Sequence, residues 1–220
     1  MTEERISALI RSYERPKNQL LSDIRKEAME TGVPVVRPET GQLLSFFTEL
    51  KAPKRVLEVG TAVGYSALLM LSCMPKDGRI TTIENYGLRI EKARENFRRS
   101  NEEARIDLLE GDAGEILKTL QGPYDLIFMD AAKAQYIVWL PEIKRLMKPG
   151  SVLISDNILQ EGDILESRFA VERRNRTIHR RMREYLEAIT GDESLSTMLL
   201  PVGDGAAVTV MKSKNDEKET

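Results

Sequence analysis

The chain has 220 residues, 41% of them hydrophobic, and its 33 basic and 35 acidic side chains give a formal net charge of -2. This length and composition suit a single globular domain, and the near-neutral charge favours neither nucleic acid nor membrane as a partner of the whole surface. The first 16 residues are too charged for a signal peptide, and no apolar run approaches the roughly 20 residues of a membrane span, so we predict a cytoplasmic protein without membrane contact.

Helical periodicity runs through the first 51 residues. Helices are predicted over residues 3–13, 17–31 and 39–50, with Gly32 and Pro34 after the second and Pro38 before the third. We expect these helices to form a cap, residues 1–51, on one domain that spans residues 1–213. Residues 214–220 belong to a charged tail without apolar side chains and are predicted to be disordered.

From Lys54 onwards, short apolar strands alternate with amphipathic helices, which is typical of a parallel sheet with right-handed crossovers. The predicted strands cover residues 55–59, 79–84, 106–110, 124–130 and 151–155. The predicted helices between them cover residues 65–74, 87–100, 115–120 and 136–147. A further helix over residues 171–189 precedes two strands, 196–200 and 206–211, and the turn-rich PVGDG between these predicts an antiparallel hairpin.

The first predicted strand runs into LEVGTAVGYS, where Gly60 and Gly64 allow a tight turn and a close approach to a ligand. Glu84 ends the second strand, where an acid can accept hydrogen bonds from ribose hydroxyls. These features leave NAD possible, but the glycines lack the G-x-G-x-x-G spacing that dinucleotides require. Glu58 would also repel a phosphate. It suits a cationic ligand, such as the amino-acid end and sulfonium of S-adenosylmethionine.

Two acidic motifs follow neighbouring predicted strands. FMDAAKAQY contains Asp130 and Lys133, and LISDN contains Asp156 and Asn157. Three oxygen ligands from these motifs would leave about three of roughly six positions on Mg²⁺ for water and substrate. A metal that binds two adjacent substrate oxygens lowers the pKa of a hydroxyl, and a nearby lysine can take its proton. Taken singly, each Asp could instead cap a helix, and Lys133 could be a solvated loop charge.

The motifs LEVGTAVGYS, TTIE, GDA, MDAAK and SDN, in this order, resemble the metal-dependent S-adenosylmethionine O-methyltransferases of the catechol and caffeoyl-CoA type over residues 33–211. The resemblance implies an α/β, Rossmann-like sheet of seven strands with the last antiparallel, and a homodimer. It implies that Lys133 is catalytic and that Asp130, Asp156 and Asn157 bind Mg²⁺ or another divalent cation. The implied contacts to S-adenosylmethionine are Val36, Glu58, Gly60, Ser66, Glu84, Asp112, Ala113 and Asp130.

An arginine-rich segment follows the second acidic motif. Seven arginines lie between Arg168 and Arg183, against the single acid Glu172. A charged helix face is usually just solvated; the functional alternative is contact with the phosphates of a nucleic acid. His179, the only histidine, is predicted to lie on the helix surface rather than to act as a base. The candidate contacts to tRNA are Arg173, Arg174, Arg176, Arg180 and Arg181.

The segments SDNILQEG, MREYLEAI and PVGDGAAV resemble one branch of this family, the bacterial tRNA 5-hydroxyuridine methyltransferases. The implied product is 5-methoxyuridine at the wobble position of the tRNA anticodon loop. The 5-hydroxyl and 4-carbonyl of that base are adjacent oxygens, as in a catechol. Ala132 stands where animal catechol enzymes place an aromatic residue before the lysine, which predicts a more open pocket. A small catechol-like metabolite remains the alternative substrate.

Overall fold

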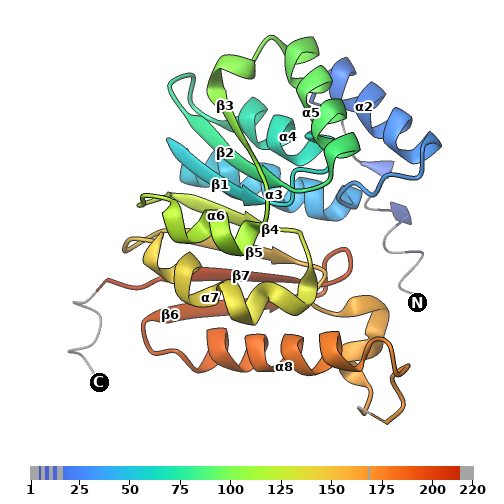
Figure 1. Ribbon diagram of the computed structural model, residues 1–220, viewed down its shortest axis with the longest axis vertical. Coiled ribbons are helices and arrows are strands. Elements are labelled where there is room, and N and C mark those ends of the chain that lie inside the picture. The colour runs from blue at the N-terminus through green and yellow to red at the C-terminus, as the bar shows by residue number, and fades with distance from the viewer. Residues whose placement is uncertain (1–4, 6–7, 10–11, 14–16, 168, 214–220) are drawn as a thin grey trace.

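The computed structural model describes residues 5, 8–9, 12–13, 17–167 and 169–213 (Figure 1). Its strands are β1 (Arg55–Val59), β2 (Arg79–Glu84), β3 (Ile106–Glu110), β4 (Leu126–Met129), β5 (Val152–Asp156), β6 (Leu195–Leu200) and β7 (Ala206–Met211). Its helices are α2 (Gln19–Glu30), α3 (Pro38–Lys51), α4 (Tyr65–Cys73), α5 (Gly87–Ser100), α6 (Ala113–Thr119), α7 (Tyr136–Arg145) and α8 (Arg176–Gly191). Three short 3-10 helices are η1 (Glu103–Arg105), η2 (Lys133–Gln135) and η3 (Gln160–Leu165). Most of the helix predicted over residues 3–13, and the whole 214–220 tail, lie outside the described residues.

The seven strands form one sheet in the order β3-β2-β1-β4-β5-β7-β6. The first five strands pair in parallel, whereas β7 runs antiparallel to both β5 and β6. The predicted seven-stranded sheet with an antiparallel last strand is therefore confirmed. The predicted hairpin of the last two strands also forms, with β7 inserted between β6 and the parallel strands.

Helices cover both faces of the sheet, as Figure 1 shows. The central strands are buried on both sides, so their side chains alternate between two cores. Phe128 and Ile154 belong to the core beneath α2, α3, α4 and α5. Ile127 and Leu153, one position earlier, belong to the core beneath α6, α7 and α8. The continuous apolar strands therefore fix the two layers of helices.

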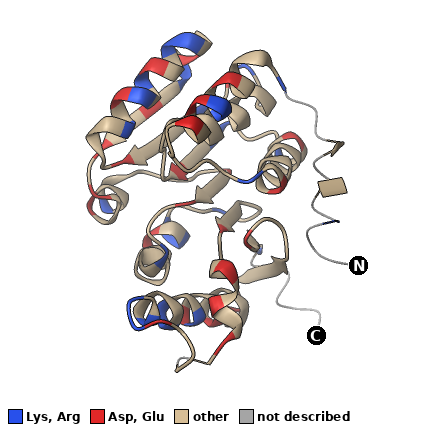
Figure 2. Cartoon of the chain, turned by 90° about the vertical axis from the view of Figure 1, so that its right-hand side faces the viewer, with Lys and Arg blue, Asp and Glu red and all other residues tan. Residues whose placement is uncertain are grey.

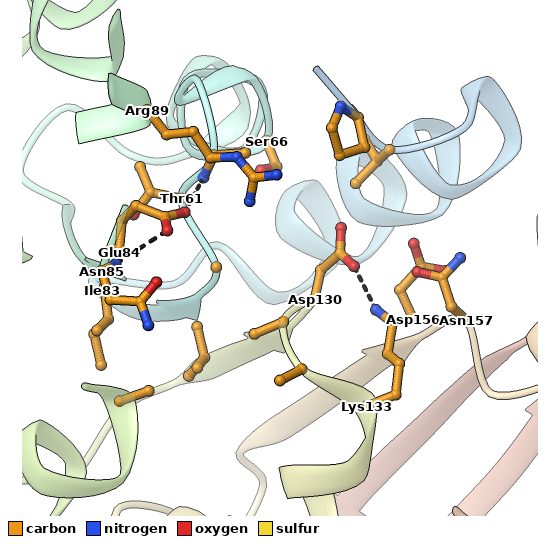
Figure 3. A pocket seen from close by; sticks show the side chains of 18 of the residues that line it. Thr61, Ser66, Ile83, Glu84, Asn85, Arg89, Asp130, Lys133, Asp156 and Asn157 are labelled. Carbon is orange, nitrogen blue, oxygen red and sulfur yellow. Dashed lines mark hydrogen bonds and ion pairs between the residues drawn. The ribbon is translucent and has the colours of Figure 1, made fainter. Parts of the chain in front are cut away.

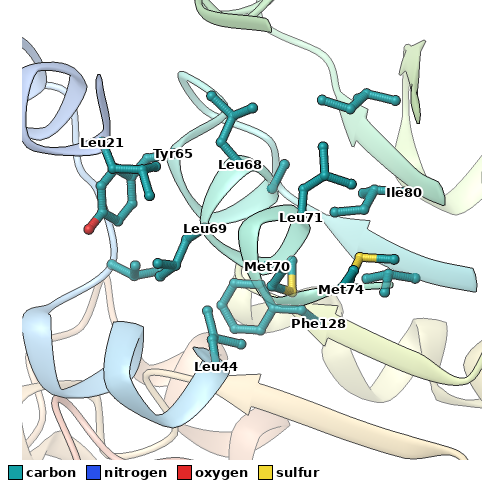
Figure 4. Close-up of a cluster of buried hydrophobic side chains, with 14 of the residues drawn as sticks. Leu21, Leu44, Tyr65, Leu68, Leu69, Met70, Leu71, Met74, Ile80 and Phe128 are labelled. Carbon is teal, nitrogen blue, oxygen red and sulfur yellow. The ribbon is translucent and has the colours of Figure 1, made fainter. Parts of the chain in front are cut away.

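The N-terminal helices bury α4, whose first seven residues are all buried. Leu21 of α2 and Leu44 of α3 lie in the same cluster as Leu69 and Met70 of α4 (Figure 4). A helix that is apolar all round needs neighbours on every side, and the sheet supplies only one of them. The helices α2 and α3 thus complete the burial of the element that follows the glycine-rich turn. Among the described residues, no helix is long and apolar enough to cross a membrane.

The long helix near the C-terminus begins at Arg176, later than the predicted position 171. The preceding residues form turns instead, with Ala170 N–H donating to the Ser167 carbonyl at 2.9 Å. Asn175 donates its side-chain amide to Asp163 of η3 at 3.0 Å. This tertiary contact holds the segment against η3, so part of the arginine-rich segment lies in a turn before the helix.

Replacing Gly64 tests the turn that starts α4. Its φ is +81°, and a Cβ there would lie 2.4 Å from Cε1 of Phe97. Gly64→Ala is therefore expected to lower the free energy of unfolding by about 2 kcal/mol, through left-handed strain and the clash with the ring. Urea denaturation measures the change. Gly87→Ala is the matched control, because a Cβ there meets nothing within 4 Å. A Gly64→Ala protein as stable as the wild type would contradict this turn geometry.

Candidate active site

A cavity of about 660 Å³ opens at the carboxyl ends of β1, β2, β4 and β5 (Figure 3). The strand order reverses direction between β1 and β4, and open α/β sheets bind ligands at such a switch point. The loop from Pro34 to Arg37, which joins α2 to α3, closes one side. The N-terminal helices therefore supply part of the cavity wall as well as burying α4.

Gly60 lets the end of β1 approach the end of β4. Its φ is +110°, and a Cβ there would lie 2.2 Å from the carbonyl oxygen of Asp130. The amides of Gly60 and Thr61 both donate to the carbonyl of Ile83, at 3.0 and 3.1 Å. The ends of β1, β2 and β4 are thus held together at the floor of the cavity, at a spacing that only glycine permits.

Glu84 is fixed at the cavity wall by backbone donors. Its carboxylate accepts hydrogen bonds from the amides of Ala62 at 2.9 Å, Asn85 at 3.0 Å and Tyr86 at 3.1 Å. Three such donors stabilise the charged carboxylate, which keeps lone pairs for further donors. Its side chain can therefore accept hydroxyl groups of a ligand without moving.

Glu58 is fully buried just below the cavity. One carboxyl oxygen accepts a hydrogen bond from Thr82 Oγ1 at 2.5 Å, and the other, Oε1, has no partner among the described residues. Burial raises the pKa of Glu58 to about 8; the nearby Ser66 and Thr82 hydroxyls lower it, and the charges of Asp130 and Glu84 raise it further. Glu58 is not among the residues that line the cavity, although Ser66 is. A cationic ligand would favour its charged form.

Lys133 is held over the end of β4 by two oxygens. Its Nζ donates to Asp130 Oδ1 at 2.6 Å and to the hydroxyl of Tyr136 at 3.2 Å. That hydroxyl donates in turn to the Met129 carbonyl at 2.8 Å. Burial raises the pKa of Tyr136 well above its ordinary value, and the charges of Asp130 and Asp156 add to the rise, so Tyr136 remains a donor. The sequence analysis missed Tyr136, although it stands three residues after the lysine in FMDAAKAQY.

Asp156 ends β5 and is 2% exposed. Burial raises its pKa to about 6, and the negative charge of Asp130 contributes further. Thr40 of α3 donates to Oδ1 at 3.3 Å, and Asn157 follows with a φ of +56°. Two carboxylates that repel each other beside an amide oxygen are a donor set suited to a hard divalent cation.

The three predicted metal ligands line one cavity, but they contribute only two carboxylates. Across the described ranges, no group of three or more His, Cys, Asp or Glu side chains could hold a metal ion. The predicted site therefore depends on the amide of Asn157 as its third ligand. The ammonium of Lys133, bonded to Asp130, is the cation that neighbours the carboxylates in this structure.

The remaining predicted cofactor contacts lie on the other walls. Val36 and Ala113 line the cavity, as does Asp112. Asp112 also accepts a hydrogen bond from the amide of Glu115 at 3.1 Å, which starts α6 at Ala113 rather than at the predicted residue 115. Trp139 of α7 also lines the cavity and was not predicted, because its helical spacing indicates only a core position.

The five candidate arginines do not line the cavity. Ion pairs join Arg174 to Glu172 at 2.7 Å and Arg180 to Glu184 at 2.5 Å. Two others donate to backbone carbonyls: Arg176 to Val171 and Phe169, and Arg181 to Ala134. Within the described part of the chain, Arg173 has no polar partner. Figure 2 shows basic and acidic residues interspersed along the ribbon of α8, so the arginine-rich segment also contains acids there.

His179 is buried, so the prediction that it lies on the helix surface was wrong. It is 3% exposed, and its Nε2 lies 3.1 Å from the Glu166 carbonyl. Met182, Tyr185 and Ile189 are buried on the same helix. The spacing of these residues with His179 marks the inner face of α8, which the surrounding arginines obscured in the sequence.

Replacing Glu58 tests the electrostatics of the cavity floor. A folded-state pKa of about 8, against 4.5 for the ordinary group, means that the folded protein binds this proton more tightly. The protonated Glu58 therefore makes its full contribution to the free energy of unfolding below pH 4.5. That contribution is lost as the pH rises through 8. Between pH 5 and 8, the free energy of unfolding of Glu58→Gln should rise relative to wild type by roughly 1 kcal/mol per pH unit.

Urea denaturation of both proteins at each pH measures this difference. Glu193→Gln is the matched control, because it replaces an exposed carboxylate away from the cavity. Its stability should follow that of the wild type at every pH. A difference between Glu58→Gln and wild type that does not change with pH would refute the raised pKa.

Comparisons with known proteins agree with this geometry. The family model for O-methyltransferases matches residues 11–212. A catechol O-methyltransferase of Niastella koreensis is 34% identical over 143 residues, which span 62% of this chain and 65%, just under two thirds, of that protein. A Mycobacterium avium protein assigned to the O-methyltransferases is 33% identical over 206 residues, which span 88% of this chain and 86% of that one.

The solved structure of Podospora anserina methyltransferase PaMTH1, bound to S-adenosylhomocysteine (SAH), has the same fold. Its TM-score is 0.86 at 26% identity, and the match covers 97% of each chain. The sheet order, the cavity at the switch point and a family match over nearly the whole length lead to one conclusion: this chain belongs to the O-methyltransferase family.

Proposed function

We propose that this protein uses S-adenosylmethionine and Mg²⁺, or another divalent cation, to methylate 5-hydroxyuridine at the tRNA wobble position to 5-methoxyuridine. The observation that carries this proposal is the placement of Lys133 and Asp156 on the same cavity as Glu84. A proton acceptor, an acidic cation site and a ribose-binding carboxylate are the three groups that such a transfer requires.

The cavity suits S-adenosylmethionine by charge. The donor carries an ammonium and a sulfonium, and the cavity is lined by four carboxylates: Glu84, Asp112, Asp130 and Asp156. Below its floor, Glu58 has a buried oxygen without a partner among the described residues. Glu84 is held with lone pairs free for the ribose hydroxyls. The SAH complex of PaMTH1 supports this assignment, because that protein shares the fold over almost its whole length.

Asp130, Asp156 and Asn157 would hold the divalent cation. When bound there, the cation supplies a Lewis acid that lowers the pKa of a substrate hydroxyl. The chain must then place that oxygen in line with the methyl group and remove its proton. Lys133 is anchored by Tyr136, so its side chain stays at the end of β4. Once its ammonium has lost a proton to solvent, the neutral amine would take the proton of the substrate hydroxyl, and the ammonium so formed would stabilise the oxyanion.

Three features favour a base in tRNA as the methyl acceptor. Ala132 lines the cavity and adds no aromatic wall there. Arg173 is exposed and has no polar partner among the described residues, so it is available to a phosphate. Arg181 joins α8 to η2 through the Ala134 carbonyl at 3.2 Å, which connects the arginine-rich segment with the turn that carries Lys133. An anticodon loop also presents its bases unstacked, so exposing the target costs little energy.

The alternative acceptor is a small catechol-like metabolite. The likeness to the Niastella koreensis catechol O-methyltransferase favours it. Two adjacent oxygens are required in either case, so the metal site does not distinguish the two substrates. The arginine-rich segment does, since a small catechol has no phosphates.

We also infer a cytoplasmic homodimer. Exposed apolar side chains on two elements support a contact with a second copy: Phe46 and Leu50 on α3, and Met198 and Leu199 on β6. A tRNA substrate would place the enzyme in the cytoplasm.

A transfer assay tests the proposed function. Protein, Mg²⁺ and S-adenosylmethionine labelled in the methyl group are incubated with tRNA that contains 5-hydroxyuridine, with the same tRNA containing uridine, or with a panel of catechols. We expect label only in the first tRNA: the uridine-containing tRNA lacks the pair of adjacent oxygens, and catechols have the pair but no phosphates for the arginine-rich segment. Label in catechols and in no tRNA would establish the alternative.

Two perturbations of the same assay test the mechanism. Removing divalent cations with a chelator should abolish transfer, and excess Mg²⁺ should restore it. Lys133→Ala should lower kcat by about 100-fold or more, the usual worth of a general base. Lys118→Ala is the matched control, since Lys118 is exposed on α6. Full activity in both chelator and Lys133→Ala would refute the mechanism.

Neutralising the exposed arginines tests the tRNA surface. Arg173, Arg174 and Arg180 are replaced together by Gln, whereas Arg181 is kept because it contacts η2. The KM for tRNA should rise and the slope of log KM against log salt should fall by about 2, because fewer counterions are released. The control replaces three exposed cations elsewhere, Lys26, Arg98 and Lys118. Equal effects of the two triple variants would mean that the arginine-rich segment has no specific role.

A further inference from the structure

Arg89 is a half-buried cation on the cavity wall without a polar partner. It lies in the first turn of α5, and Figure 3 shows its guanidinium extended over the cavity. The guanidinium carbon lies 5.6 Å from the centre of the Tyr86 ring, which supports it from outside. Within the described part of the chain, the guanidinium of Arg89 forms no hydrogen bond or ion pair, although it has five N–H donors.

The other two cations that line the cavity, Lys133 and Arg37, are already engaged. Lys133 is paired with Asp130 at 2.6 Å, and Arg37 donates to the Gly203 carbonyl at 3.3 Å. The other charged residues that line the cavity are carboxylates: Glu84, Asp112, Asp130 and Asp156. Arg89 is therefore the lining cation whose side chain is free to pair with an anionic group, among the described residues.

The proposed methyl donor carries one such group. Its ammonium and sulfonium suit the acidic wall, but its amino-acid end also has a carboxylate. A guanidinium can bind a carboxylate through two parallel hydrogen bonds. Figure 3 shows Arg89 on the same side of the cavity as Glu84, with Asp130 and Lys133 on the other side.

Resting on the proposed function, we infer that Arg89 binds the carboxylate of the amino-acid end of S-adenosylmethionine. The sequence gives no motif for this role, because position 89 lies outside the glycine-rich turn and the acidic motifs. In this arrangement the carboxylates of the cavity face the positive groups of the donor, and Arg89 binds its one negative group.

Calorimetric titration with two ligands tests the inference. One ligand is SAH, and the other is 5′-deoxy-5′-(3-aminopropylthio)adenosine, which is the same molecule with hydrogen in place of the carboxylate. Arg89→Gln should weaken SAH binding by about tenfold or more, the range for a hydrogen bond to a charged group. Its affinity for the second ligand should change by less than about twofold. Arg89→Lys should recover part of the loss, since it restores the charge but not the paired donors.

Arg98→Gln is the matched control, because Arg98 is exposed on the same helix and does not line the cavity. Its affinity for both ligands should equal that of the wild type. An equal loss of both ligands in Arg89→Gln would show that Arg89 only shapes the cavity. Unchanged binding of both, with a raised KM for the methyl acceptor, would assign Arg89 to the acceptor instead. Either result overturns the inference alone, whereas a wild-type protein that does not bind SAH overturns the proposed function as well.

Discussion

The close contact between the ends of β1 and β4 is the constraint on which the cavity depends. Gly60 brings the backbone of β1 so near Asp130 that a Cβ would lie 2.2 Å from its carbonyl oxygen. The contact has an electrostatic consequence, because Glu58 stands two residues before Gly60. The fully buried carboxyl of Glu58 therefore lies near the half-buried aspartate at the end of β4, whose charge raises the pKa of Glu58. The neighbouring α4 is packed on all sides, so the turn has no room to relax.

Four carboxyl groups are gathered at the ends of β1, β2, β4 and β5. Glu84 is stabilised by three backbone amides, and Asp130 is paired with Lys133. Glu58 and Asp156 are less well compensated, and their pKa values rise to about 8 and about 6. Folding alone gains nothing from burying such groups, because an uncompensated carboxylate costs free energy. The arrangement therefore suits cationic ligands, such as the sulfonium donor and the divalent cation of the proposed function.

The sequence predicts the sheet well because its signals are local. Apolar runs with turn residues between them define each strand, and the bounds of β1, β2, β3 and β7 agree with the structure. The start of α8 and the burial of His179 could not be read in this way. The first depends on the contact between Asn175 and Asp163, and the second on which face of α8 meets the sheet. Both are tertiary contacts that leave no local pattern.

The residues of the candidate site also fall into two groups: those that local sequence motifs predict and those that only the folded structure reveals. Residues in short motifs at strand ends, such as Glu84 and Asp156, were predicted because parallel strands deliver their carboxyl ends to one edge. Tyr136 and Arg89 were missed because their positions look like ordinary helix starts. Their roles become visible only when the lysine and the cavity charges are in place.

Asp130 links the two halves of the cavity. Its charge raises the pKa of Glu58 on the proposed donor side and that of Asp156 on the proposed metal side. A cation beside Asp130 therefore reduces the repulsion felt by both, whichever side it occupies. Binding on one side lowers the electrostatic cost of ionising the acid on the other, and by linkage the effect is reciprocal. Lys133 is paired with the same aspartate, so a cation bound on either side would also change the charge beside the proposed proton acceptor.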